Sequence, residues 1–227
     1  MTDIYKAPGA DFSSSPSDFT VSDALGEAWA KTRGNKKTIW AGFMLYLLVV
    51  IPISLVLKLC LDEGMFAHGI RLIVVNSVDV ALVAGLWMLG VKLTAGVKAN
   101  AQEVYAYIEH FPKLLAAYFL ISALVAAGFF LLVLPAIYLA VSYLFASILI
   151  VDRKLGIWEA LETSRKAVTR CWFRVFFIAV IYGVILILSS VTVLGLIWTL
   201  PMGVLLRGVV YRHVFGYAPA ADEPQVA

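Results

Sequence analysis

The stretch LLAAYFLISALVAAGFFLLVLPAIYLAVSYLFASILIV, residues 114–151, contains 38 residues and no Asp, Glu, Lys or Arg. A helix that crosses a bilayer needs about 20 apolar residues. The stretch is therefore long enough for two crossings, and Pro135 divides it into predicted spans at 114–134 and 136–151. The second span has only 16 residues, which leaves open an earlier start, a tilt or a kink at the proline.

Four more apolar stretches predict spans at 38–61, 72–97, 172–190 and 191–211. Of the 227 residues, 62% are hydrophobic and 15% are charged, and the mean hydropathy is +0.90. Soluble domains are about half apolar and a quarter charged. The sequence therefore predicts an all-α, polytopic membrane bundle of about six transmembrane helices. The composition excludes a soluble enzyme, a secreted disulfide scaffold and a disordered chain.

The segments outside the spans divide into termini and helical connectors. Residues 20–216 are expected to form a single membrane domain, between a disordered cytosolic leader at 1–19 and a disordered tail at 217–227. Amphipathic helices are expected on the cytosolic face at 21–33 and 156–171. For the first helix, Thr20 with Asp23 is close to a capping box, and Gly34-Asn35 is a stop signal.

Lys and Arg are distributed unevenly between the two sides of the predicted membrane. The N-terminal segment contains five, the loop 98–113 two, the loop 152–171 five and the C-terminal end one, whereas the opposite loops contain Arg71 alone. Cytosolic loops carry an excess of these residues, so we expect both termini in the cytosol. This topology places Cys60 and Cys171 on opposite faces, where they cannot pair. The formal net charge is only +3, which predicts no nucleic-acid partner.

A weak internal repeat aligns residues 27–45 with residues 159–177. The aligned pairs are Glu27 with Glu159, Ala28 with Ala160, Thr32 with Ser164, Arg33 with Arg165 and Trp40 with Trp172. Each stretch runs from an amphipathic segment into an apolar span. Two interpretations remain open, a fold of repeated units and a coincidence among residue types that are common at membrane borders.

The stretch PAIYLAVSYLFASILIVDRKLGIWEALETSRKAVTRCWFRVF, residues 135–176, combines a proline turn, an acidic-basic-glycine turn and an Ala-Leu-x-x-Ser amphipathic helix. It resembles uncharacterised bacterial six-helix inner-membrane proteins and the membrane domain of bacterial glycerophosphodiester phosphodiesterases. The resemblance implies a six-helix architecture in a bacterial inner (cytoplasmic) membrane. Since the sequence has no soluble phosphodiesterase domain, the resemblance implies no reaction.

Asp79 is an ionisable residue inside the second predicted span, and Asn76 precedes it by one turn on the same face. Lys58 lies near the outer end of the first span, from which it could pair with Asp79 across the hairpin. An ionisable residue in a span predicts a proton or ion site. The alternative, which the absence of a second intramembrane acid favours, is a structural contact that holds two helices together.

Five cations lie at or near the cytosolic ends of spans: Arg165, Lys166, Arg170, Arg174 and Arg207. Such side chains can extend along the span to reach lipid headgroups. They can also form a site for lipid phosphate or a surface for a partner protein. The alternative is an ordinary interfacial connector.

The sequence contains no catalytic motif, Gly-rich phosphate loop or cluster with metal-ligand spacing. We therefore expect a non-catalytic membrane protein without cofactor or metal. Its predicted function is to organise anionic lipid or a partner complex through basic amphipathic cytosolic helices. The alternatives are a small transporter or carrier that uses Asp79 and, third, a membrane enzyme acting on lipid.

Overall fold

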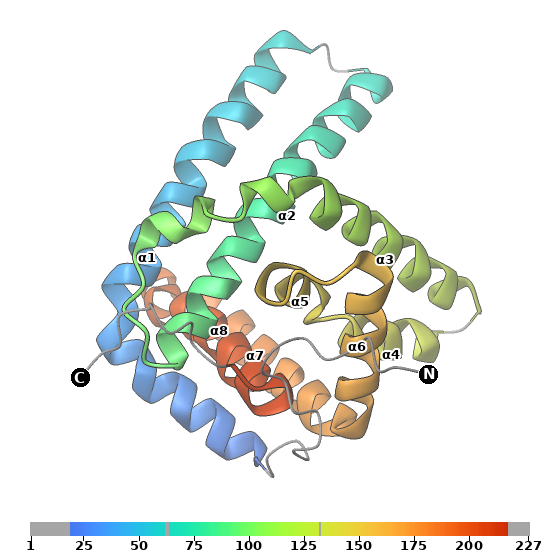
Figure 1. Cartoon of the computed structure of the whole chain (residues 1–227). Helices are drawn as coiled ribbons and strands as arrows, with labels where there is room; N and C mark the ends of the chain where they lie inside the picture. The colour runs from blue at the N-terminus through green and yellow to red at the C-terminus, as the bar shows by residue number, and fades with distance from the viewer. Residues whose placement is uncertain (1–18, 62–63, 132, 218–227) are drawn as a thin grey trace.

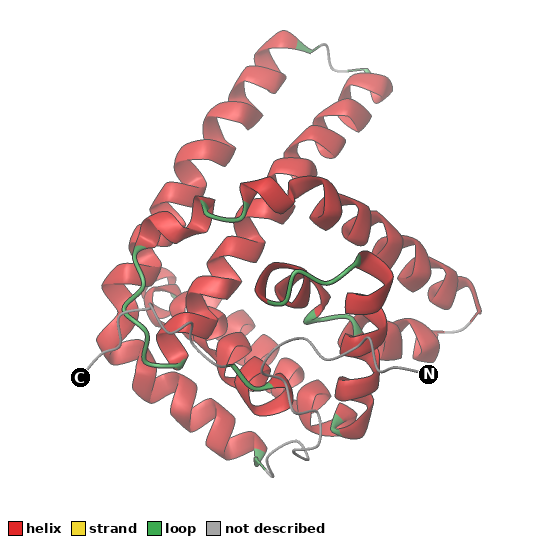
Figure 2. Ribbon diagram, in the orientation of Figure 1, coloured by secondary structure: helices red, strands yellow, loops and turns green. Residues whose placement is uncertain are grey.

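A computed structural model describes residues 19–61, 64–131 and 133–217. Its described part consists of eight α-helices and two short 3₁₀ helices, and no β-strand occurs in these ranges (Figure 2). Six helical segments are long and apolar enough to cross a membrane. The predicted all-α fold with six spans is confirmed. The predicted disorder of residues 1–18 and 218–227 concerns segments outside the described ranges.

Helix α1 (Val21–Cys60) begins at the expected capping box, in which the Thr20 hydroxyl accepts a hydrogen bond from the Asp23 amide (3.2 Å). The predicted stop at Gly34-Asn35 is wrong, because α1 continues through it. A glycine inside a helix costs only about 1 kcal/mol. The burial of Thr32 and Ile39 on either side of Gly34 outweighs this cost.

The next elements are α2 (Met65–Thr94), the 3₁₀ helices η1 (Ala101–Tyr105) and η2 (Ile108–His110), and α3 (Phe111–Leu131). The second apolar helix starts seven residues before the predicted span at 72–97 and ends before it. Segment η1 lies directly against α2, since a Cβ on Gly85 would come within 2.2 Å of the Val104 carbonyl oxygen. Lys92 and Glu103 form an ion pair across this contact (2.8 Å).

The apolar stretch after α3 forms two short helices, α4 (Val133–Ser142) and α5 (Ala146–Asp152). The predicted span at 136–151 therefore starts earlier, at Val133, which is one of the alternatives left open, and a turn at 143–145 divides it into two helices. Pro135 lies in the first turn of α4, where a proline is tolerated because the first amides of a helix have no partner within it. Helix α5 is almost entirely buried: Ala146, Ile148, Leu149, Ile150 and Val151 are core residues.

The last elements are α6 (Ile157–Arg170), α7 (Trp172–Val191) and α8 (Val193–Phe215). Cys171 separates α6 from α7, and Thr192 alone separates α7 from α8. In contrast, the aligned repeat stretch 27–45 lies within the single helix α1. The first stretch is one continuous helix and the second is interrupted at Cys171. Ala28 and Ala160 are nevertheless both fully buried.

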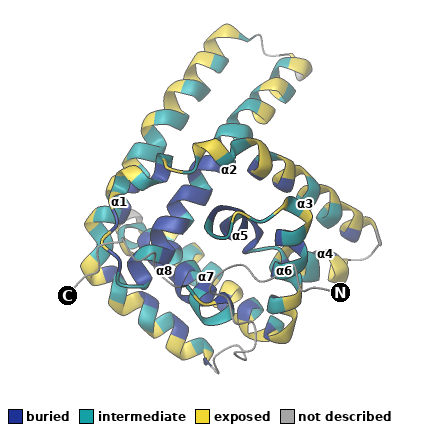
Figure 3. Cartoon of the chain, viewed as in Figure 1, coloured by how far each residue is buried: buried dark blue, intermediate teal, exposed yellow. Residues whose placement is uncertain are grey.

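Helices α1–α2, α3–α4 and α7–α8 form three hairpins that meet at a common base. In Figure 1 the tips of the first two hairpins point to different sides of the molecule. Buried residues concentrate where the hairpins meet, and exposed residues concentrate at the tips (Figure 3). Apolar tip residues are 72–91% exposed: Leu59, Phe66, Phe130, Leu134, Val191 and Leu194. Such exposure is stable in lipid and not in water.

An ionic cluster joins both described ends of the chain at the base. Glu27 of α1 pairs with Arg212 (2.9 Å) and His213 (3.3 Å) of α8. Arg212 and Lys31 both donate to the Thr94 carbonyl oxygen at the end of α2 (2.6 and 2.7 Å). These cations compensate the negative end of the α2 dipole. The two described ends therefore lie on the same side of the bundle.

The predicted leader at 1–19 is wrong at its last residue. Phe19 is buried (3% exposed) and stacks on His213 with ring centroids 5.0 Å apart. Burial of the large apolar Phe19 ring stabilises the position of the backbone at residue 19.

Candidate functional site

Asp79 on α2 accepts a hydrogen bond from the Tyr46 hydroxyl of α1. The predicted Asp79–Lys58 pair is wrong: Lys58 is exposed, and no ion pair links these two described residues. Lys58 lies 12 residues beyond Tyr46, which is about 18 Å along the helix. Asp79 therefore holds α1 and α2 together well inside the hairpin.

Asn76 faces a different neighbour. Its Oδ1 atom accepts a hydrogen bond from the Tyr118 hydroxyl of α3 (3.3 Å), and its amide nitrogen donates to the Leu72 carbonyl oxygen of its own helix (2.7 Å). Asn76 and Asp79 thus connect α2 to two different helices. The structure does not bring the two polar groups to one shared partner.

Helix α6 is amphipathic, with one buried face formed by Ala160, Leu161, Ser164 and Val168. On the other face Glu162 forms a bidentate contact with Arg165 (2.7 and 2.9 Å) and a second ion pair with Lys166 (3.3 Å). These cations lower the pKa of Glu162 from its ordinary 4.5 to about 2. The same contact raises the pKa of Arg165. The charge of Arg165 is therefore largely compensated within the helix.

Lys166, Arg170 and Arg174 follow one another at four-residue steps across the junction of α6 and α7. All three are exposed, and 68% of the Lys166 side chain is accessible. Arg170 has no carboxylate within ion-pair distance among the described residues. Three of the five predicted cations are thus exposed around the junction of α6 and α7, and we call these three the basic row. Arg174 also lies over the Phe19 ring, 6.0 Å from its centre.

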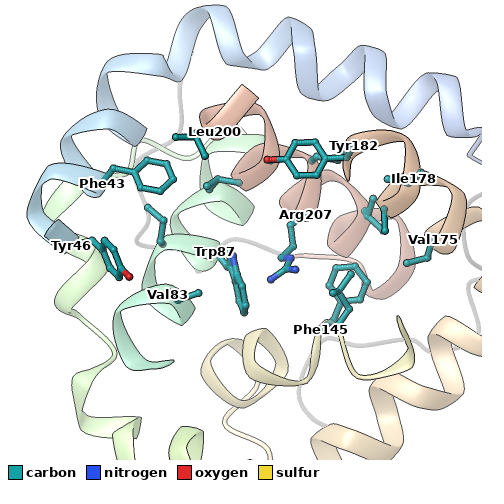
Figure 4. Close-up of a pocket in the computed structure, with 17 residues that line it drawn as sticks. Phe43, Tyr46, Val83, Trp87, Phe145, Val175, Ile178, Tyr182, Leu200 and Arg207 are labelled. Carbon is teal, nitrogen blue, oxygen red and sulfur yellow. The ribbon is translucent and has the colours of Figure 1, made fainter. Parts of the chain in front are cut away.

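Arg207 is not part of this row. It lies on α8 and projects into a cavity of about 370 Å³ among α1, α2, α7, α8 and the turn before α5 (Figure 4). The other lining residues are almost all apolar: Phe43, Tyr46, Val83, Leu86, Trp87, Leu144, Phe145, Val175, Ile178, Ala179, Tyr182, Leu200, Gly203, Val204, Leu206 and Val210. Eight residues, or about 12 Å, separate Arg207 from the end of α8.

The Arg207 guanidinium lies over the indole ring of Trp87, 3.7 Å from the ring centre. Its Nη1 atom is shielded from solvent and has no hydrogen-bond partner within the described ranges. An arginine in the middle of a membrane helix costs about 3 kcal/mol to insert, and a desolvated cation–π contact returns about 2 kcal/mol. The charge is thus only partly compensated in the folded protein.

Glycines hold the walls of this cavity in place. A Cβ on Gly203 would come within 1.9 Å of the Tyr182 hydroxyl oxygen, so a larger residue would displace this ring. A Cβ on Gly208 would come within 2.6 Å of the Gly90 carbonyl oxygen. This close crossing of α2 and α8 fixes Trp87, one turn from Gly90, and Arg207, which is next to Gly208.

The sequence could not assign Arg207 to a cavity, because the assignment depends on how α8 packs against α2. A tryptophan inside a span and away from the interfaces, as Trp87 is, was the available signal. Tyr46 was missed for the same reason, although a phenol inside the first span is itself a candidate partner for Asp79.

The two cysteines are free, with Cys60 exposed at the end of α1 and Cys171 buried at the base. No group of three or more His, Cys, Asp or Glu residues in the described part of the chain is arranged to hold a metal ion. The fold defines a class, an all-helical multi-pass membrane protein. No family model, curated protein or solved structure matches the chain.

Proposed function

We propose that this protein is a non-catalytic component of the bacterial inner membrane, with both termini in the cytosol, that organises anionic lipid through its basic row. The observation that carries this proposal is the exposed series Lys166, Arg170 and Arg174 at the start of a membrane span. Each Lys or Arg near an anionic surface contributes about 1 kcal/mol of attraction.

The position of α6 supports contact with headgroups. Trp158 near its start is 67% exposed, and tryptophan favours the membrane–water interface. Ser164 anchors the opposite face by donating to the Ser142 carbonyl oxygen of α4 (2.7 Å). Trp172 donates to the Tyr138 carbonyl oxygen of the same helix (3.4 Å). The basic row is thus held on a fixed support.

The test is native mass spectrometry of the full chain with phosphatidylglycerol as the anionic probe. Neutralising Lys166 and Arg170 to Gln removes about 2 kcal/mol of attraction, which lowers the affinity about 30-fold. The matched control neutralises Arg33 and Lys37, which are also exposed and four residues apart. An equal loss in the control would assign the binding to general basic charge and contradict the proposal.

A partner protein that docks on the basic row is the other form of this function. In this case native mass spectrometry should show a bound protein instead of a bound lipid. The bound protein should be lost when Lys166 and Arg170 are neutralised. The experiment above separates the two outcomes in one spectrum.

The second candidate function is a small carrier that uses Asp79. The observation in its favour is that Tyr46, which donates to Asp79, also lines the Arg207 cavity. A carrier of this kind would lose proton flux into vesicles on Asp79→Asn and keep it when Lys166 and Arg170 are neutralised. The lipid-organising function predicts the reverse: lipid binding is lost when Lys166 and Arg170 are neutralised and is kept in Asp79→Asn.

A further inference from the structure

We propose that the cavity at Arg207 is a binding site for an amphiphile that has one acyl chain and a carboxylate or phosphate headgroup. The site is separate from the basic row, because none of Lys166, Arg170 and Arg174 lines the cavity. The inference therefore goes beyond the proposed function.

The charge of the ligand follows from the Arg207 guanidinium. Its Nη1 atom is closed off from solvent and has no hydrogen-bond partner in the described part of the chain, and no carboxylate there forms an ion pair with it. Carboxylates and phosphates accept hydrogen bonds from a guanidinium with matching planar geometry. The rest of the Arg207 side chain lines the cavity and is partly exposed there, so an anionic headgroup in the cavity would compensate the charge of the guanidinium.

The apolar part of the ligand follows from the remaining walls. In Figure 4 Phe43, Val83, Leu200 and Ile178 surround the space next to Arg207. A free anion would leave these walls without apolar contact. These four residues belong to the α1–α2 and α7–α8 hairpins, whose outer parts expose apolar side chains. In a bilayer an acyl chain could therefore enter between them without crossing water.

The size of the cavity selects one chain. Its volume of about 370 Å³ lies near the lower end of the range of ligand sites, roughly 300–1,000 Å³. Along α8 the lining extends from Leu200 to Val210, which is about 15 Å. A cavity of this volume and length accommodates a single chain. A diacyl lipid could insert one chain only and would leave the other chain in the bilayer.

The experiment uses the full chain in nanodiscs of neutral lipid, with stearate brominated in mid-chain as the probe. Bromine quenches indole fluorescence, and Trp87 is the only tryptophan among the lining residues. We expect a saturable quenching component that disappears in Trp87→Phe. Arg207→Met should weaken the binding at least tenfold, and the brominated methyl ester, which has no charge, should bind at least tenfold more weakly.

A second variant tests the site even if Arg207→Met does not fold. Ala179→Phe fills part of the cavity and leaves Arg207 in place, so it should weaken stearate binding while the melting temperature is maintained. The Lys166 and Arg170 variant should bind the probe normally, which separates this site from the basic row.

Three results would overturn the inference. They are no saturable quenching, equal binding of the methyl ester, and displacement of the probe by inorganic phosphate alone. The last result would assign Arg207 to a free anion. Brominated lysophosphatidic acid and phosphatidic acid distinguish a phosphate headgroup from a carboxylate, and stronger binding of the diacyl lipid would overturn the single-chain assignment.

Discussion

The Arg207 guanidinium lies 3.7 Å from the centre of the Trp87 indole ring and makes no ion pair with a described carboxylate. An arginine that served only stability would not be expected at this position, since a buried unpaired charge destabilises the fold. The position of Arg207 therefore favours a role in binding over a role in stability.

Arg207→Met should raise the melting temperature of the ligand-free protein. The substitution removes the desolvation cost and keeps most of the side-chain volume, so a gain of about 1 kcal/mol corresponds to about 2–4 °C. Thermal unfolding in detergent measures it. Arg212→Met is the contrasting variant, because it breaks the pair with Glu27 and should lower the melting temperature. A fall with Arg207→Met would show that the arginine is structural.

Gly208→Ala should destabilise the protein by about 1–3 kcal/mol, the usual cost of overpacking. The added Cβ would lie 2.6 Å from the Gly90 carbonyl oxygen and force α8 away from α2. Gly183→Ala is a matched control, because its Cβ would have no neighbour within 4 Å. The control should be neutral or slightly stabilising, as alanine favours helices. Thermal unfolding of both variants tests the difference, and equal effects would contradict the close crossing.

Tyr46→Phe and Asp79→Asn should each destabilise the protein by about 1.5–3 kcal/mol, the range for hydrogen bonds to charged groups. Because the two residues are each other's partners, the double variant should lose no more than either single variant. Lys58→Gln should leave the stability unchanged, since Lys58 is exposed and lies far from the Tyr46–Asp79 contact. Additive losses in the double-mutant cycle would show that the two groups act separately.

The Glu162 contacts predict a defined pH dependence. The pKa of Glu162 is about 2 in the folded protein, below its ordinary 4.5, so the carboxylate stabilises the fold fully above pH 4.5. This stabilisation is lost as the pH falls from 4.5 towards 2. The difference in melting temperature between wild type and Glu162→Gln should be the same at pH 7 and pH 5 and smaller at pH 3. A difference that changes between pH 7 and pH 5 would contradict the assignment.

Much of the fold could be predicted from hydropathy, because a membrane span is set by a local property of about 20 residues. The connector at 156–171 was predicted almost at its observed bounds, since its apolar spacing and flanking glycine are also local. Gly34-Asn35 was misread because the local signal for a stop competes with burial of Thr32 and Ile39, which depends on other helices.

The site was less predictable than the fold. The sequence identified Asp79 and Arg207 as unusual residues, because charges are rare inside spans. It assigned the wrong partner to Asp79 and a surface role to Arg207. Both assignments depend on the rotation and crossing of helices, which are determined by side-chain packing and by contacts such as Gly90 with Gly208.

The pair between Glu27 and Arg212 joins residues 185 positions apart. At synthesis rates of about 5–20 residues per second, roughly 10–40 s pass between the emergence of the two residues from the ribosome. During this interval Glu27 has been synthesised and Arg212 has not, so this ion pair cannot yet form. The base of the bundle can therefore close only late in biosynthesis, which makes its assembly sensitive to any truncation or pause near the end of translation.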